Sequence, residues 1–155
     1  MTRIATSVTI DRPVDDVWSF AIDPRNDPVW QTNVIEVGRG ADGPIETGTE
    51  IDETFTFLGR RFPVTLVVTD HQPPHRSAVS VSGAPVPGRG SYEFEPCEGG
   101  TRFTMTFEAE AHRLFKLAEP VFARLLRRDL AACCERLKDL LEAGADRNDL
   151  RTDAA

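Results

Sequence analysis

Three side chains of a reactive type occupy positions where apolar residues are expected: Glu53, Tyr92 and Asp129. Glu53 lies between Ile51 and Phe55 in an alternating row, so its carboxyl group is expected on the inward face of a strand. Burial would raise the pKa of this carboxyl group, which could then serve as an acid, a base or a polar anchor. The alternative is a twist or bulge that leaves Glu53 at an exposed rim.

Tyr92 and Asp129 each have two interpretations. Tyr92 has inward parity on its strand, so its hydroxyl either orients a ligand or bonds to a backbone carbonyl in a solid core. Asp129 projects within the apolar arc of a long helix, with Arg136 two turns further on. It is either a polar group on a cavity wall or a helix-edge carboxylate paired with a base. Any catalysis by these groups would be general acid–base chemistry, and the sequence leaves open whether there is any.

No cofactor site is expected from the remaining reactive residues. The three cysteines, two of them adjacent, show no Cys-x-x-Cys spacing, and the three histidines show no metal-ligand spacing. We find no Ser-His-Asp order and no nucleotide-binding glycine loop. His71 and His75 are expected in solvent, and His112 is a candidate for the rim of a cavity. We therefore expect no metal, no other cofactor and reduced thiols in a cytoplasmic protein.

The composition and charge of the chain limit the classes of partner that we expect. The 155 residues carry a formal net charge of −7, which disfavours nucleic acid and anionic membranes as partners. No stretch reaches the roughly 18 apolar residues of a membrane span, and no signal peptide is expected. With 40% hydrophobic residues, the chain has enough apolar side chains for the core of a single domain. A monomer and a homodimer both remain open.

Hydrophobic periodicity predicts a strand, two short helices, six further strands and one long helix. Strands are expected at about residues 4–10, 34–37, 49–57, 62–70, 77–82, 92–95 and 103–108. The short helices follow Pro13 and surround Asp27-Pro28, and the long helix runs from about Pro120 to Ala143. Residues 1–143 are expected to form the domain, and residues 144–155 a polar, disordered tail.

Gly59 is expected to be the first residue of a type II′ turn, because glycine adopts a positive φ at little cost. The corresponding register pairs Phe57 with Phe62, Phe55 with Val64, Glu53 with Leu66, and Ile51 with Val68. All eight side chains would then share one face. A sheet with one apolar face must be covered, and only the last helix is long enough to cover it. The expected class is α+β: a curved antiparallel sheet wrapped around a C-terminal helix.

This order of elements resembles the START-like, helix-grip superfamily (SRPBCC), which includes the birch pollen allergen. More narrowly, it is similar to the bacterial polyketide cyclase/dehydrase and lipid-transport branch. The resemblance covers residues 2–143. It is carried by Ile10–Trp18, Pro28–Gln31, Gly48-Thr49, Phe57–Arg61, Phe94–Pro96, Gly99–Arg102 and Leu137–Glu142.

The resemblance implies a cavity between the sheet and the long helix. The inward residues of the predicted elements supply its lining: Trp30, Ile51, Phe55, Phe57, Phe62, Val64, Tyr92, Phe94, Phe103, Met105, Phe107, Phe122 and Leu126. The same residues would also fill a solid core. We therefore expect a binding protein for a small hydrophobic or polyketide- or lipid-like molecule. The alternatives are a polyketide cyclase or aromatase that uses the same cavity, and a co-chaperone-like interaction module.

Overall fold

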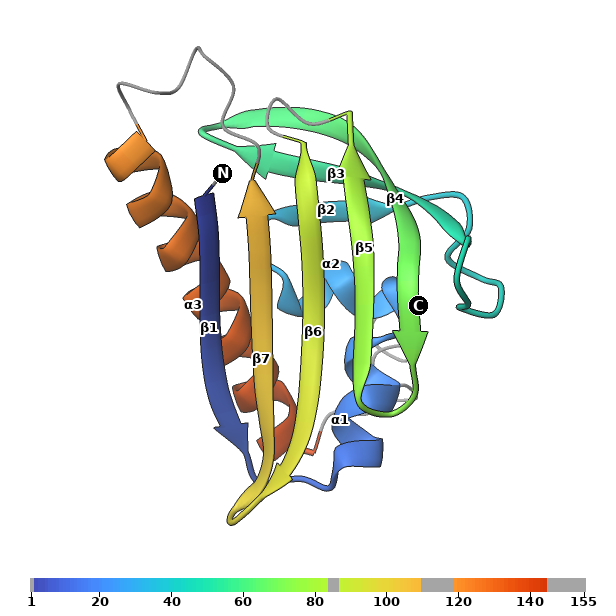
Figure 1. Ribbon diagram of the computed structural model, residues 1–155, viewed down its shortest axis with the longest axis vertical. Helices are drawn as coiled ribbons and strands as arrows, with labels where there is room; N and C mark the ends of the chain where they lie inside the picture. Colours follow the sequence, from blue (N-terminus) through green and yellow to red (C-terminus); the bar gives the residue numbers. More distant parts are fainter. Residues whose placement is uncertain (1, 84–86, 110–118, 145–155) are drawn as a thin grey trace.

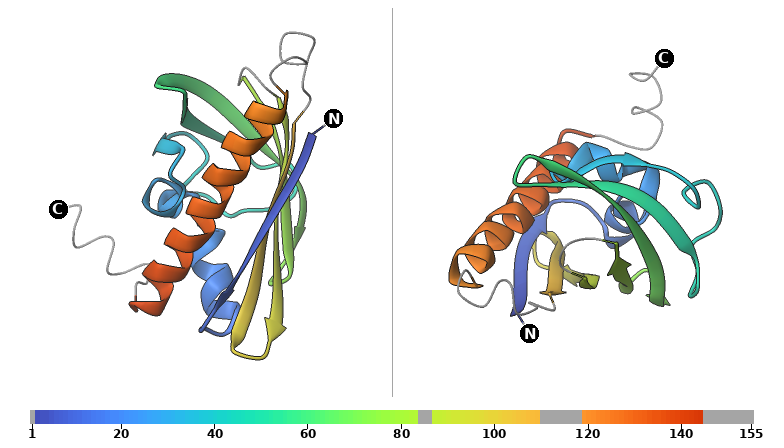
Figure 2. Two further views of the ribbon diagram at one scale, coloured as in Figure 1. Left: turned by 90° about the vertical axis from the view of Figure 1, so that its left-hand side faces the viewer. Right: turned by 90° about the horizontal axis from the view of Figure 1, so that it is seen from above.

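In the described part of the chain, seven strands form one antiparallel sheet that curves around the helices (Figures 1 and 2). The computed structural model describes residues 2–83, 87–109 and 119–144. The strands are β1 (Thr2–Ile10), β2 (Val34–Val37), β3 (Glu50–Phe57), β4 (Arg60–Gln72), β5 (Arg76–Ser82), β6 (Gly88–Cys97) and β7 (Gly100–Ala109). Their order across the sheet is β1-β7-β6-β5-β4-β3-β2, so the first strand lies beside the last. The expected curved antiparallel sheet is confirmed.

The short helical segments lie between β1 and β2. They are α1 (Val14–Ala21), the 3₁₀ helix η1 (Pro24–Asn26) and α2 (Asp27–Trp30). Pro13 precedes α1 in an extended conformation. The side chain of Asn26 donates from Nδ2 to the carbonyl oxygen of Phe20 at 2.9 Å, which ties η1 back to α1. This contact lies directly before the start of α2.

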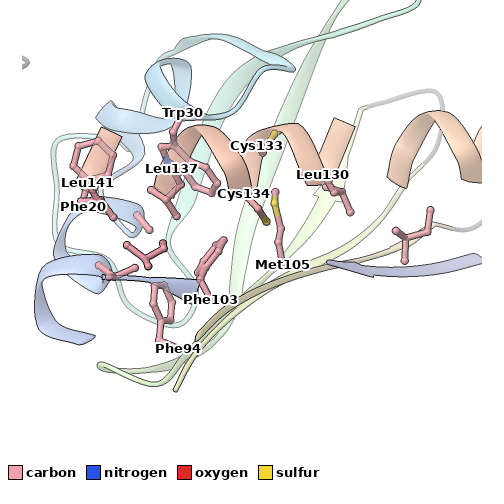
Figure 3. Close-up of a cluster of buried hydrophobic side chains, with 14 residues drawn as sticks. Phe20, Trp30, Phe94, Phe103, Met105, Leu130, Cys133, Cys134, Leu137 and Leu141 are labelled. Atoms are coloured by element: carbon pink, nitrogen blue, oxygen red, sulfur yellow. The ribbon is translucent and has the colours of Figure 1, made fainter. Parts of the chain in front are cut away.

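The long helix α3 (Glu119–Glu142) spans about 36 Å along the concave side of the sheet near β1 (Figure 2). Its C-terminal half packs into a core with β1, β7 and α1 that includes Phe103, Leu130, Leu137 and Leu141 (Figure 3). A second, smaller cluster lies on β3, β4 and β5, and contains Ile51, Val64, Leu66 and Val81. The helix-grip arrangement is therefore confirmed, with α3 anchored mainly at one edge of the sheet. No helix in the described ranges is long and apolar enough to cross a membrane.

The β3–β4 hairpin corrects the predicted register. Its turn consists of Leu58 and Gly59, with φ of 51° and 76°, and Phe57 pairs with Arg60. Two positive φ angles are typical of a type I′ turn, whose twist matches that of the flanking strands. The paired residues are Phe55 with Phe62, Glu53 with Val64, and Ile51 with Leu66. The error is two residues, so the same side chains still face inward.

The β6–β7 hairpin is also tighter than the sequence suggested. The predicted strands end at about residue 95 and begin again at about residue 103, but the observed strands continue to Cys97 and start again at Gly100, joined by Glu98 and Gly99. Gly99 has φ of 90°, which glycine tolerates without strain. Of the predicted tail, residues 144–155, only Gly144 is among the described residues. His112 also lies outside them.

Candidate functional site

A cavity of about 170 Å³ lies between the two packed clusters. Its wall comes from the concave face of β3 to β7, the segment after α1, and the N-terminal half of α3. Phe122 and Leu126 face it from α3, whereas the C-terminal half of the helix packs into the solid core. The space exists because α3 lies close to β1 and leaves the central strands only partly covered.

Most of the predicted lining residues lie at this wall. They are Ile51, Phe55, Phe57, Phe62, Tyr92, Met105, Phe107, Phe122 and Leu126. The wall also contains Val79 and Val81, which have inward parity on β5, and Ile45 from the loop between β2 and β3. At the helix end, Phe57 meets Phe122 edge-on with ring centroids 5.8 Å apart.

Four predicted residues lie elsewhere. Trp30, Phe94 and Phe103 are almost completely buried in the solid core (Figure 3), where their rings contact one another or Tyr92. Val64 is buried in the smaller cluster. Inward parity is shared by core and cavity residues, so the position of α3 decides which of them border the open space.

Glu53 is only 4% exposed, so β3 does not leave it at an exposed rim. Its atom Oε1 is buried and has no hydrogen-bond donor. Burial raises the pKa of this carboxyl group, and Asp27 opposes the rise by hydrogen bonding to it. Glu53 thus faces a second acid rather than a base.

Asp27 is the functional candidate that the sequence analysis missed. It begins α2, is 6% exposed, and lies at the cavity wall. Burial raises the pKa of Asp27 well above the usual value. The charge of Glu53 and a hydrogen bond between the two carboxyl groups also raise this pKa, whereas a hydrogen bond from the Gln31 amide lowers it. Atom Oδ1 of Asp27 also has no donor. The two carboxyl groups are therefore expected to share a proton.

Tyr92 lies beside this carboxyl pair. Its hydroxyl accepts a hydrogen bond from Gln31 Nε2 at 2.7 Å, so it is a side chain rather than a backbone carbonyl that holds it. The pKa of Tyr92 is raised well above its usual value by burial and by the nearby charges of Asp27 and Glu53. The accepted bond leaves the Tyr92 proton free to be donated.

Asp129 faces the cavity from α3 and is half-buried. Burial raises its pKa, with a smaller opposite effect from Arg128. The alternative, a pair with a base, does not occur among the described residues; Arg136 donates to the carbonyl oxygen of Val29. Asp129 is thus a polar group on the cavity wall.

His71 was expected in solvent, but it is partly buried. Its ring packs on Trp18 with centroids 5.3 Å apart, and Nδ1 lies 3.2 Å from the hydroxyl of Ser77, itself at the cavity wall. His75 is exposed, as expected. Within residues 2–83, 87–109 and 119–144, no group of three or more His, Cys, Asp or Glu residues could hold a metal ion.

The model of the family described as "Polyketide cyclase / dehydrase and lipid transport" matches residues 1–142. The chain belongs to this family. Membership in the polyketide cyclase/dehydrase and lipid-transport family agrees with the curved sheet, the terminal helix and the internal cavity described above. No curated protein matches the sequence significantly.

Solved structures share the fold of this family member at low sequence identity. TTHA0849 from Thermus thermophilus is 15% identical with a TM-score of 0.77, over 93% of this chain and 100% of its own. A protein from Rhodobacter sphaeroides is 20% identical with a TM-score of 0.71, over 92% of this chain and 93% of its own. The Polyketide_cyc-like protein Cgl2372 from Corynebacterium glutamicum is 19% identical with a TM-score of 0.58, over 90% of this chain and 91% of its own.

Proposed function

We propose that this protein binds a small apolar molecule in the cavity between the sheet and α3. The observation that carries the proposal is the open space itself, about 170 Å³ bordered by aromatic and aliphatic side chains. An apolar cavity of this size costs on the order of a few kcal/mol of stability compared with a filled core. A ligand that fills the space would recover that energy, and the family description supports such a role.

Gly90 offers a direct test of this proposal. It lies on β6 at the wall, and a Cβ there would be 3.6 Å from Val79 Cγ2 and 3.9 Å from Phe107 Cδ2. Gly90→Val would therefore keep the strand and extend its methyl groups toward the open space. The matched control is Gly43→Val, because Gly43 is exposed and a Cβ at this position would have nothing within 4 Å.

Binding is measured with Nile red, a neutral apolar dye whose fluorescence rises in apolar surroundings. Wild type and Gly43→Val should bind the dye alike, and Gly90→Val should bind it at least tenfold more weakly. Native mass spectrometry of protein purified without denaturation would reveal any molecule that remains bound. Equal dye binding by Gly90→Val and wild type would refute the cavity as the binding site.

Acid–base catalysis in the same cavity is a second candidate function. Asp27 and Tyr92 lie together at the wall, and the carboxyl pair keeps a proton where a bent, reactive ligand would lie. The test is the aldol cyclisation of a synthetic poly-β-ketone thioester. Asp27→Asn should lower turnover by roughly 10²- to 10⁴-fold and leave substrate binding intact. Turnover at the uncatalysed rate by wild type would exclude this second function.

The interaction-module alternative has less support. It would need an apolar patch on the outer face of the sheet. The outward side chains of β3 and β4 are instead mostly polar, and Thr65 donates a hydrogen bond to Asp52 there at 3.1 Å. Asp52 also pairs with Arg39.

A further inference from the structure

The cavity wall is acidic although the chain contains 18 Lys and Arg residues. In the described part of the chain, the ionisable side chains at the wall are Asp27, Tyr92 and Asp129, and no Lys, Arg or His lies among them. Glu53 adds another acid directly behind Asp27. A bound molecule would therefore meet acids from α2 and α3, with no Lys, Arg or His among the described lining residues to neutralise them.

Asp27 is a carboxyl group in need of a donor. It is only 6% exposed, it lies at the wall, and its Oδ1 accepts no hydrogen bond. A shared proton can serve the contact with Glu53, but Oδ1 of Asp27 still has no donor. A buried acceptor without a donor is costly, and an ammonium group that approached it would supply one.

Asp129 provides another acid at the cavity wall. It extends from α3, whereas Asp27 begins α2, and it forms no hydrogen bond or ion pair within the described ranges. A cationic group in the cavity would be attracted by both acids. A carboxylate in the same place would be repelled by both.

We propose that the cavity selects apolar molecules that end in an amine, with the protonated nitrogen donating to Asp27, over alcohols and carboxylates of the same chain length. This inference rests on the proposed binding function and specifies its ligand class. A hydrogen bond between an ammonium and a buried carboxylate is among the strong ones, so the preference should be about ten- to hundredfold. The apolar tail would lie against the aromatic side chains.

The test is displacement of Nile red at pH 7 by octylamine, 1-octanol and octanoate, all below their micellar concentrations. The three probes each have an unbranched chain of eight carbons and differ in the head group, the carboxylate carbon of octanoate being one of its eight. Wild type should bind octylamine about ten- to hundredfold more tightly than 1-octanol, and octanoate should bind weakest. Octanoate binding as tightly as octylamine, or octanol equal to octylamine, would overturn the proposal.

Two variants and a matched control, Asp139→Asn, assign the preference to a residue. Asp27→Asn should bring octylamine to the affinity of octanol, whereas Glu53→Gln should keep the preference because Asp27 retains its carboxyl group. Asp139→Asn removes the same formal charge from an exposed position on α3 and should change nothing. An unchanged preference in Asp27→Asn, with its fold verified by circular dichroism, would refute the role of Asp27.

The outcomes separate this inference from the proposed function. If wild type binds Nile red and all three probes displace it equally, the binding function stands and the amine preference fails. If wild type does not bind the dye and no probe binds by calorimetry, the binding function itself fails, and the amine preference fails with it.

Discussion

The buried pair of Asp27 and Glu53 should give the protein a measurable pH dependence of stability. Both carboxyl groups have a raised pKa in the folded protein, mainly because burial disfavours their charged form. Between the ordinary carboxyl pKa of about 4 and the raised values, the folded state binds more protons than the unfolded state. The contribution of the pair is therefore fully present at low pH and is lost as the pH rises through the folded-state values.

Glu53→Gln changes this dependence with little change of shape. It replaces a buried carboxyl group that can carry a charge with a neutral amide, whose NH2 can donate to Asp27. Removal of a buried charge in this way is worth about 1–3 kcal/mol, so the variant should be more stable than wild type at pH 7 by that amount. For a chain of this length the melting temperature should rise by about 2–10 °C.

The assay is urea unfolding at several pH values from 5 to 8. We expect the free energy of unfolding of wild type to fall more steeply with pH than that of Glu53→Gln. Glu50→Gln is the matched control, because Glu50 is an exposed acid at the start of the same strand. A pH slope identical in wild type and Glu53→Gln, or a less stable variant at pH 7, would refute the carboxyl-pair reasoning.

Four further variants test the remaining geometry. Tyr92→Phe should cost about 1–2 kcal/mol in urea unfolding, because it leaves the Nε2 donor of Gln31 without its acceptor; no loss would contradict that bond. Phe103→Ala should lower the free energy of unfolding by about 3–5 kcal/mol, because it leaves a cavity in the solid core. Phe57→Ala, at the wall of the existing cavity, should lower it clearly less, and equal losses would mean that the cavity is packed. Leu58→Asn should raise the free energy of unfolding by about 0.5–1 kcal/mol. The reason is that Asn tolerates the left-handed conformation of this exposed turn residue better than Leu does. A loss of stability would refute the type I′ turn.

The sequence predicted which side chains face inward more reliably than it predicted their partners. In the β3–β4 hairpin the alternation of apolar and polar residues determines the face, and a shift of two residues leaves that face unchanged. The burial of Glu53 could therefore be foreseen although its partner across the hairpin is Val64 rather than Leu66. Register depends on which two residues form the turn, and Leu58 gives no sign of a positive φ.

The division between core and cavity could not be read from the same pattern. Trp30 and Phe103 satisfy every local criterion for lining a pocket, yet α3 and α1 close over them. Asp27 was missed for a different reason. It lies in a helix of four residues, too short to show a periodic pattern, and an Asp before Pro is typical of an exposed helix start. Its burial results from contacts with elements far away in the sequence.

The pairing of β1 with β7 has a consequence for how the chain can fold. Thr2 pairs with Ala109 and Ile10 with Thr101, so the first strand has no sheet partner until nearly the whole domain has been synthesised. β2 to β7 can form successive hairpins as they leave the ribosome, but β1 must wait for a contact that closes a loop of about a hundred residues. The slow step of folding is thus expected to be the capture of β1, and α3, which packs against it, is then held in place last.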